Sequence, residues 1–381
     1  MNATVLGSVA VAASTLTGCA GEKPDTFRVY FGTSAKDEQR GIYMAELDMK
    51  TGTLSDAVRV SKAMRPGFIA IDSSGKHIYA TGAGSTFEGR APGVVSAFSI
   101  LENGMLADLN SQPSGGAGPT HVSLDPSGNH LLVANYRGAS CSVLPIRPDG
   151  ALAPPSSTRV HTGSSIHPDR QTQAYTHSIN TSPDGRFAFA ADLGMDKIMI
   201  YRFDPTTGKL EPNDPAFTKI EQGGGPRHFT FHPTGKFAYV SLELSNKVTA
   251  FTYDTDKGTL DETQTVSTLP EGYRLPNTTA EVITSADGRF LYVSNRGHDS
   301  IAIFSIDAET GLLTLLDRES VRGQIPRNFN IDPTGTFLVV ANQKTSNVVV
   351  FKIDRKTGLI AFTGSEIEVP SPICVRFLAA P

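Results

Sequence analysis

The sequence has no tryptophan and only three cysteines in 381 residues, and aromatic residues make up only 8% of it. The absence of tryptophan excludes repeats built on a Trp-Asp dipeptide. Cys141 and Cys374 lie in apolar segments with strand character, so we expect buried free thiols rather than a disulfide. No Cys-x-x-Cys pair is present to hold a metal ion.

The sequence also lacks a strong excess of charge of one sign and has no long apolar run. The net charge of -4 and the isoelectric point near 6.1 give no general attraction to nucleic acid or to an anionic membrane surface, so we expect no nucleic-acid partner. The Gly-x-Ser-x-Gly, His-Glu-x-x-His, Walker and Gly-x-Gly-x-x-Gly motifs are absent. Their absence argues against several common hydrolase and nucleotide-binding classes.

The first 26 residues differ from the rest of the chain. Val5 to Leu16 form a short apolar segment typical of a signal peptide, and the following Leu-Thr-Gly-Cys ending at Cys19 resembles a bacterial lipoprotein cleavage box. Residues 1–19 are therefore predicted to be a signal segment, Cys19 the lipidated residue and 20–26 a tether. The protein would be exported and touch a membrane only through this anchor. No basic residue precedes the apolar segment, so an unlipidated secretory signal, or a chance composition in a cytoplasmic protein, stays open.

The sequence is rich in residues that favour turns, with 36 glycines and 24 prolines. Two kinds of turn recur roughly every 50 residues, and such self-similarity indicates a repeat architecture. The first kind resembles Asp-Pro-x-Gly, with glycines at Gly75, Gly128, Gly185, Gly235, Gly288 and Gly335. The second is mostly Thr-Gly followed by x-Leu or x-Ile, with glycines at Gly52, Gly104, Gly150, Gly208, Gly258, Gly311 and Gly358.

The segments between these turns read as short strands rich in Val, Ile, Phe, Tyr and Ala, four to a repeat. Four strands in about 40–50 residues is the signature of a β-propeller blade. The N-terminal repeat lacks its first strand, and Ile373 to Leu378 form a single strand left over at the C-terminus. The sequence therefore predicts an all-β fold over residues 27–381. It is a seven-bladed β-propeller of four-stranded antiparallel blades, whose ring is closed when the C-terminal strand joins the N-terminal strands.

The first kind of turn also fixes a register. The first strand of each blade begins, and the second ends, on the face opposite to these turns, near the centre of the ring. Side chains seven or eight positions before or after the turn glycine should therefore gather there. Polar residues at these positions are Thr120, His121, Asn135, Tyr136, His177, Asp192, Arg227, His228, Glu243, Glu281, Asn295, Arg296, Arg327, Asn328, Asn342 and Gln343.

With these residues in place, the chain resembles the 6-phosphogluconolactonase-type lactonases, seven-bladed propellers related to fungal carboxymuconate-lactonising enzymes. The segments that carry the resemblance are GSSIHPDRQ (163–171), THS (176–178), GPRHFTFHPTG (225–235), the stretch 280–304 and PRNFNIDPTGTFLVVANQ (326–343).

The resemblance implies catalytic roles for His177, Glu243, Arg227 and Arg296. Glu243 would be the general base or an electrostatic partner, and His177 an acid or base. The two arginines would bind the substrate anion and stabilise the oxyanion. Tyr175 and Leu242 depart from the usual His and Asn of the family's motifs. Further candidates for substrate binding are His121, Arg170, His228, Glu281, Arg327 and Gln343.

The expected function is hydrolysis of a sugar-type lactone, without metal or cofactor, on an anionic small-molecule substrate. Two alternatives stay open from the sequence. One is a lactonase or cycloisomerase for a non-phosphorylated lactone such as a muconolactone. The other is an exported propeller that binds a ligand or partner and has lost catalysis, because a fold alone does not fix function. The sequence gives no indication of the oligomeric state.

The lipoprotein interpretation predicts that cells fed a labelled fatty acid will label the native protein but not its Cys19→Ala variant, because a thiol must carry the lipid. The measurement is fluorography of the immunoprecipitated protein. Cys141→Ala is the matched control and should label like the native protein. Equal absence of label in all three proteins contradicts lipidation.

Overall fold

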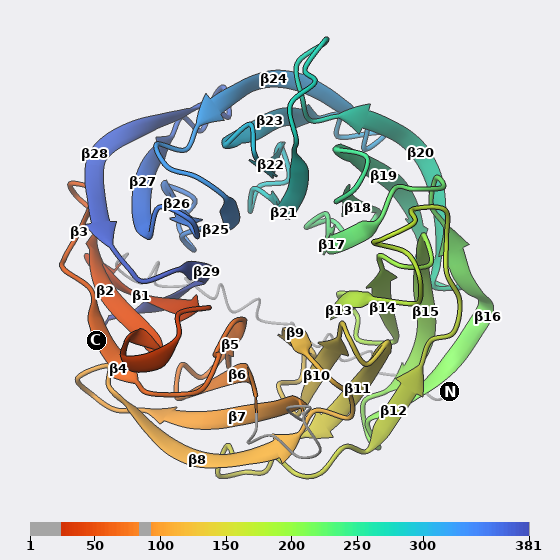
Figure 1. The fold of residues 1–381 in the computed structure, drawn as a ribbon, viewed down its shortest axis with the longest axis horizontal. Helices are drawn as coiled ribbons and strands as arrows, with labels where there is room; N and C mark the ends of the chain where they lie inside the picture. The colour runs from red at the N-terminus through yellow and green to blue at the C-terminus, as the bar shows by residue number, and fades with distance from the viewer. Residues whose placement is uncertain (1–23, 84–92, 381) are drawn as a thin grey trace, which may run out of the picture.

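In the computed structural model, which describes residues 24–83 and 93–380, 29 strands form seven antiparallel sheets arranged as a ring (Figure 1). The described residues also include one 3₁₀ helix, η1 (Asp37–Gln39), and none of their helices is long and apolar enough to span a membrane. The predicted seven-bladed propeller is confirmed. The signal segment and Cys19 lie outside the described residues.

Each sheet is one blade, and its strands follow one another from the centre of the ring outward. The innermost strands are β5 (Ile69–Ile71), β9 (Pro119–Leu124), β13 (Thr176–Thr181), β17 (Pro226–Phe231), β21 (Thr278–Thr284), β25 (Pro326–Ile331) and β29 (Pro372–Ala379). The second strands are β1 (Thr26–Thr33), β6 (His77–Ala83), β10 (His130–Asn135), β14 (Phe187–Asp192), β18 (Phe237–Leu242), β22 (Phe290–Arg296) and β26 (Phe337–Asn342).

The third and fourth strands complete the blades. The third strands are β2 (Ile42–Asp48), β7 (Gly93–Ile100), β11 (Ser140–Pro145), β15 (Lys197–Asp204), β19 (Lys247–Asp254), β23 (Ser300–Ile306) and β27 (Asn347–Ile353). The outermost strands are β8 (Leu106–Pro113), β12 (Ser157–Val160), β16 (Lys209–Lys219), β20 (Thr259–Ser267), β24 (Leu313–Ser320) and β28 (Ile360–Glu368). In the closing blade this place is shared by β3 (Thr53–Leu54) and β4 (Val58–Ser61), which both pair with β2.

The ring closes where the two ends of the propeller meet. Strand β29 pairs with β1 in antiparallel register, with Phe31 opposite Val375 and Val29 opposite Phe377. This is the predicted closure, and it leaves the inner edge of β1 covered. Strand β1 begins at Thr26, one residue before the predicted start of the propeller. Cys374 on β29 is buried and unpaired, as is Cys141, in agreement with the prediction for these thiols.

The hydrophobic core lies between neighbouring blades. Phe189 and Ile200 of one blade pack against Phe229 and Val240 of the next in a single buried cluster. Because both faces of a blade are covered in this way, its second and third strands are apolar almost throughout, as in β10 and β26.

The second kind of turn explains why its glycine recurs. At Gly258 the backbone has φ of +69°, and an added Cβ would lie 2.3 Å from the ring of Phe187 in the neighbouring blade. The turn therefore needs glycine for its conformation and for its close packing. Another turn of this kind, at Gly311, also receives a hydrogen bond from the neighbouring blade, since the Tyr239 hydroxyl donates to the carbonyl of Gly311 at 3.0 Å.

Deleting residues 373–381 should lower the melting temperature and cause association, because it removes the partner of β1 and exposes an apolar strand edge. Differential scanning calorimetry and size-exclusion chromatography measure both effects. A shorter truncation after Ala379, which keeps β29 complete, is the control. A monomer with an unchanged melting temperature after the longer deletion contradicts closure by β29.

Candidate active site

The inner strands bulge where they begin. In β17, Arg227 and His228 together lie opposite a single residue of β18, because the pairing register shifts there. Strands β13 and β25 bulge at the corresponding places, at His177 and Arg327. A bulge inserts one extra residue and re-aims the neighbouring side chains. As a result, two consecutive side chains of β17 reach the centre of the ring.

A buried carboxylate holds three arginines together at this centre. Oε1 of Glu243, directly after β18, lies 2.5 Å from Nη2 of Arg170, and Oε2 lies 3.0 Å from Nε of Arg227 and 2.9 Å from Nη2 of Arg296. Nη2 of Arg296 also donates to the carbonyl of Thr279. Both carboxylate oxygens are therefore occupied by guanidinium groups. Three neighbouring blades meet at this one side chain.

This cluster carries a surplus of positive charge. Burial raises the pKa of Glu243, but Arg296, Arg227 and Arg170 outweigh burial and hold it well below its usual range. Arg327 adds a fourth positive charge, and burial together with Arg296 lowers the pKa of its guanidinium to about 10. One carboxylate thus faces four cations, which favours an anionic ligand.

Several donors in the cluster have no partner. Nη1 of Arg227 and Nε of Arg296 are buried without a hydrogen bond, and Arg327 donates none to other described residues. A buried donor left unsatisfied costs about 1–3 kcal/mol, and more when it is charged. Most buried polar groups in proteins are satisfied. Unpaired donors gathered at one place indicate a site that a ligand completes.

Three histidines lie beside the arginines. The ring centroid of His228 is 5.3 Å from that of His121 and 5.2 Å from that of His177. Burial, and then the charges of Arg227 and other neighbours, hold the pKa of His177 well below its usual range. Burial and the same arginine contribute to a lowered pKa of His121 as well. These imidazoles are neutral near pH 7.

His228 differs from the other two because a carboxylate holds its ring. Its Nδ1 lies 2.8 Å from Oε1 of Glu281 on β21, and Oε2 of Glu281 accepts a hydrogen bond from the amide of Asn328 on β25. Burial lowers the pKa of His228 to about 4 although Glu281 opposes this shift. A neutral His228 therefore donates from Nδ1 to Glu281. Its Nε2 is buried and has no partner.

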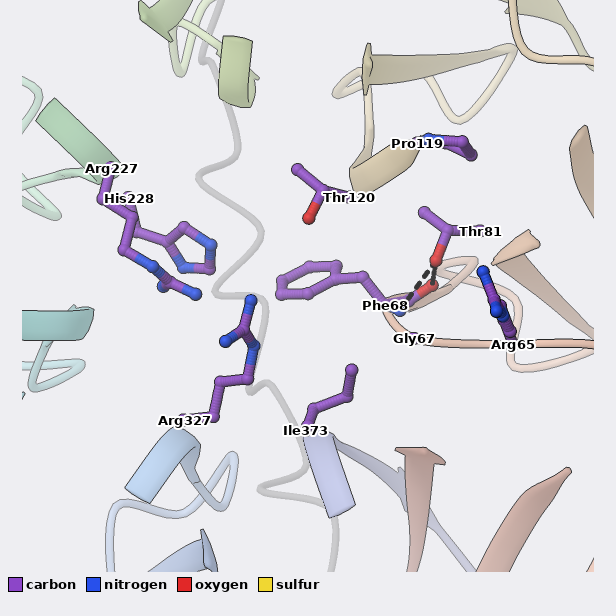
Figure 2. Close-up of a pocket in the computed structure, with 10 residues that line it drawn as sticks. All are labelled: Arg65, Gly67, Phe68, Thr81, Pro119, Thr120, Arg227, His228, Arg327 and Ile373. Atoms are coloured by element: carbon purple, nitrogen blue, oxygen red, sulfur yellow. Dashed lines mark hydrogen bonds between the residues drawn. The ribbon is translucent and has the colours of Figure 1, made fainter. Parts of the chain in front are cut away.

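A cavity of about 110 Å³ opens onto these groups. Figure 2 shows Arg227 and His228 extending from one side and Arg327 from an adjoining side toward the central space, which the ring of Phe68 enters from the other side. Thr120 and Ile373 complete the wall at the corresponding positions of their strands. The volume is enough for several water molecules.

A second, more open pocket of about 460 Å³ lies beside the cluster. The rings of Tyr136 and Tyr175 stack there with centroids 4.8 Å apart, and Arg137 and Gln173 line the same pocket. Arg170 belongs both to this pocket and to the Glu243 cluster. An aromatic platform next to arginines suits a polar ring with an anionic substituent.

The site residues predicted from the sequence differ in whether they contact Glu243, lie around its cluster or lie elsewhere. Glu243 contacts Arg227, Arg296 and Arg170, whereas His177, His121, His228, Glu281 and Arg327 surround this cluster. Gln343 does not join it, because its amide donates to Ser34 of the closing blade at 3.0 Å.

Sequence reasoning missed Phe68 and Arg376. The guanidinium carbon of Arg376 lies 4.7 Å from the centre of the Phe68 ring, and the tilted ring of His121 lies 4.4 Å from the same ring centre. Phe68 stands seven positions before Gly75, so the register itself could have revealed it. Among the described residues, no group of three or more His, Cys, Asp and Glu side chains is placed to hold a metal ion.

Comparison with known proteins agrees with this architecture. The family described as "Lactonase, 7-bladed beta-propeller" matches residues 28–377. The chain therefore belongs to the family of seven-bladed β-propeller lactonases.

Individual relatives cover nearly the whole propeller. The chain is 38% identical to a 6-phosphogluconolactonase of Bacillus subtilis, over 92% of this chain and 97% of the relative. It is 35% identical to a 6-phosphogluconolactonase of Formosa agariphila, over 77% and 83%. The solved structure of a periplasmic gluconolactonase of Pseudomonas aeruginosa superposes with a TM-score of 0.87 at 34% identity, covering 93% of this chain and all of that one (100%).

Replacing Glu243 by Gln should lower the free energy of unfolding by about 3 kcal/mol at pH 7, since removing one partner of a buried ion pair strands the other charges. The pKa of Glu243 is lower in the folded than in the unfolded protein. Its contribution to stability is therefore full above the unfolded value of about 4.3 and decreases as the pH falls further. Urea unfolding at pH 7 and pH 3.5 measures the difference between the two proteins.

Glu262→Gln on the outermost strand β20 is the control, and it should change stability by less than about 0.5 kcal/mol. A Glu243→Gln variant as stable as the native protein at pH 7 contradicts the charge arrangement described above.

Proposed function

We propose that this protein hydrolyses the ring ester of a sugar-acid lactone at the site around Glu243. The observation that carries the proposal is the set of unpaired buried donors on Arg227 and Arg296, next to a cavity that Arg327 also lines. Membership of the lactonase family supports the reaction class. The relatives named 6-phosphogluconolactonase and gluconolactonase support a sugar-acid lactone as substrate.

The reaction needs an attacking water, stabilisation of an oxyanion and a proton for the leaving oxygen. Water adds to the lactone carbonyl carbon, and negative charge develops on the carbonyl oxygen. The free Nη1 of Arg227 and Nε of Arg296 are fixed donors for this charge, and they lie in a buried region where such stabilisation is strong. Collapse of the intermediate breaks the ring C–O bond and gives the hydroxy acid.

Glu243 acts through the arginines and not as a base. Both of its oxygens accept hydrogen bonds from guanidinium groups, and its pKa is held well below the usual range. It orients Arg227 and Arg296 so that their remaining donors face the substrate. Of the two roles predicted for Glu243, the structure favours the electrostatic one.

His177 contributes as a neutral imidazole. It is buried, its Nδ1 has no partner, and its pKa lies well below neutral, first because of burial and then because of Arg227. A neutral ring N–H can donate a hydrogen bond to a carbonyl or leaving oxygen without carrying charge. In the proposed mechanism His177 donates such a hydrogen bond from its place beside His228, which lines the cavity.

The surplus of arginine selects an anionic lactone. Arg327 has no acceptor among the described side chains and lines the cavity, so it is free to pair with a carboxylate or phosphate of the substrate. Arg170 and Arg137 offer the same chemistry at the outer pocket.

We also propose that the protein acts outside the cytoplasm, anchored through Cys19. The short apolar segment and cleavage box of residues 1–19 support this location, as does the similarity to a periplasmic gluconolactonase. Export disfavours a phosphorylated intermediate of central metabolism as the physiological substrate. A non-phosphorylated lactone that carries a second, free carboxylate would fit both the positive charge of the site and this location.

A panel of glucono-, 6-phosphoglucono- and muconolactone tests the proposal, with hydrolysis followed by acid release at constant pH. The native protein should hydrolyse at least one sugar lactone above the spontaneous rate. Arg327→Ala should raise KM about tenfold for anionic lactones and little for neutral ones, because a charge-assisted hydrogen bond is worth about 1.5–3 kcal/mol. Arg202→Ala, which removes an exposed arginine of β15, is the control.

The outcomes separate the candidate functions. Hydrolysis of muconolactone alone assigns the non-phosphorylated muconolactone activity instead. No hydrolysis of any lactone, together with measurable binding of one, leaves a propeller that only binds its ligand.

A further inference from the structure

We infer that His228, held by Glu281, is the base that activates the attacking water. The inference rests on the proposed lactone hydrolysis and adds a catalytic residue to it. Three observations carry it: the paired Nδ1 of His228, its unpaired Nε2, and its place in the wall of the cavity beside Arg227.

Glu281 fixes the tautomer of His228. Its Oε1 lies 2.8 Å from Nδ1, and it is itself held by the Asn328 amide and by the backbone N–H of Val282. Because Nδ1 donates to a carboxylate, the lone pair of the neutral ring is on Nε2. A carboxylate that orients an imidazole in this way is the arrangement that general bases use in hydrolases.

The other two histidines beside the arginines, His121 and His177, lack this arrangement. His121 accepts a backbone N–H bond from Ile179 on its Nδ1, which leaves a proton and not a lone pair on Nε2. His177 has no carboxylate on either ring nitrogen among the described residues, and its Nδ1 is unpaired. Of these three rings, only His228 is held so that a basic nitrogen is free.

The water has a place to bind. The cavity of about 110 Å³ is lined by His228, Arg227 and Arg327, whose side chains Figure 2 shows extending toward the same space. A water bound there lies against His228 and Arg227, which both line this cavity. The ring of Phe68 covers the opposite side of this space.

The proton balance closes over one turnover. His228 Nε2 takes a proton from water as the water oxygen bonds to the lactone carbonyl carbon, and the carbonyl electron pair moves to its oxygen. When the tetrahedral intermediate collapses, the ring C–O bond breaks and the same proton passes from Nε2 to the leaving alkoxide. The hydroxy acid leaves, and its carboxyl proton is released to solvent near neutral pH.

His228→Asn should lower kcat by about 10²–10⁴-fold with a small change in KM, because Asn keeps the bond to Glu281 but has no basic nitrogen. The matched control is His161→Asn. Nδ1 of His161 lies 2.6 Å from Asp192 in another buried pair, which does not line the cavity. This control should lose stability in a similar way but keep kcat within about tenfold.

Glu281→Gln tests the positioning role through a pH profile. The groups around His228 are Glu281, Arg227, Arg327, His121 and His177, and the carboxylate of Glu281 raises the pKa of His228. In the native protein kcat/KM should fall toward acid as His228, with a pKa of about 4, becomes protonated. Removing the negative charge should move this acidic limb to lower pH and also lower the plateau. A change in folding alone would lower the plateau without moving the limb.

The two levels of the proposal fail in different ways. If the native protein hydrolyses no lactone, the proposed function fails and the inference fails with it. If the native protein is active and His228→Asn keeps its kcat, only the inference is overturned. If His228→Asn does not fold, as judged by circular dichroism, an unmoved acidic limb in Glu281→Gln overturns the inference.

Discussion

The site depends on one buried negative charge. Glu243 forms ion pairs with Arg227 and Arg296 of two neighbouring blades and with Arg170 of the loop that leads into β13, so it joins them at the centre of the ring. Without this carboxylate the guanidinium groups would repel one another in a region with little water. With it, each arginine is oriented and still has donors to spare. The arrangement favours the folded protein and leaves an incomplete shell for an anion.

Most of the fold could be predicted because its signals are local. Turn glycines such as Gly258 are required by backbone conformation and by close packing against the next blade, so they recur at each repeat. The second strands are buried on both faces and read as apolar runs. Other features have no recognisable signal in the local sequence. Examples are the division of the outer strand of the closing blade into β3 and β4, and the bulges at His177 and Arg327.

The candidate site was predictable as a set of positions but not as a set of contacts. Counting from the turn glycines placed Arg227, Glu243 and Arg296 at the centre, because strand register fixes where a side chain starts. Register does not fix where a long side chain ends. The amide of Gln343 reaches Ser34, although Gln343 occupies the same position in its blade as Glu243 does. The pair of His228 and Glu281 likewise joins two blades, and the sequence near either residue does not predict this contact.

The arginines affect the protonation of the three histidines beside them. Burial and the arginines keep His121, His177 and His228 neutral, because a second positive charge beside a guanidinium is unfavourable. The same positive charges would attract the anionic substrate proposed above. Once such a substrate binds, it cancels part of the field, and the affinity of the imidazoles for a proton rises while the ester is in place. The proposed base would thus become stronger when the substrate arrives, and this coupling follows from placing neutral histidines beside arginines that still have unpaired donors.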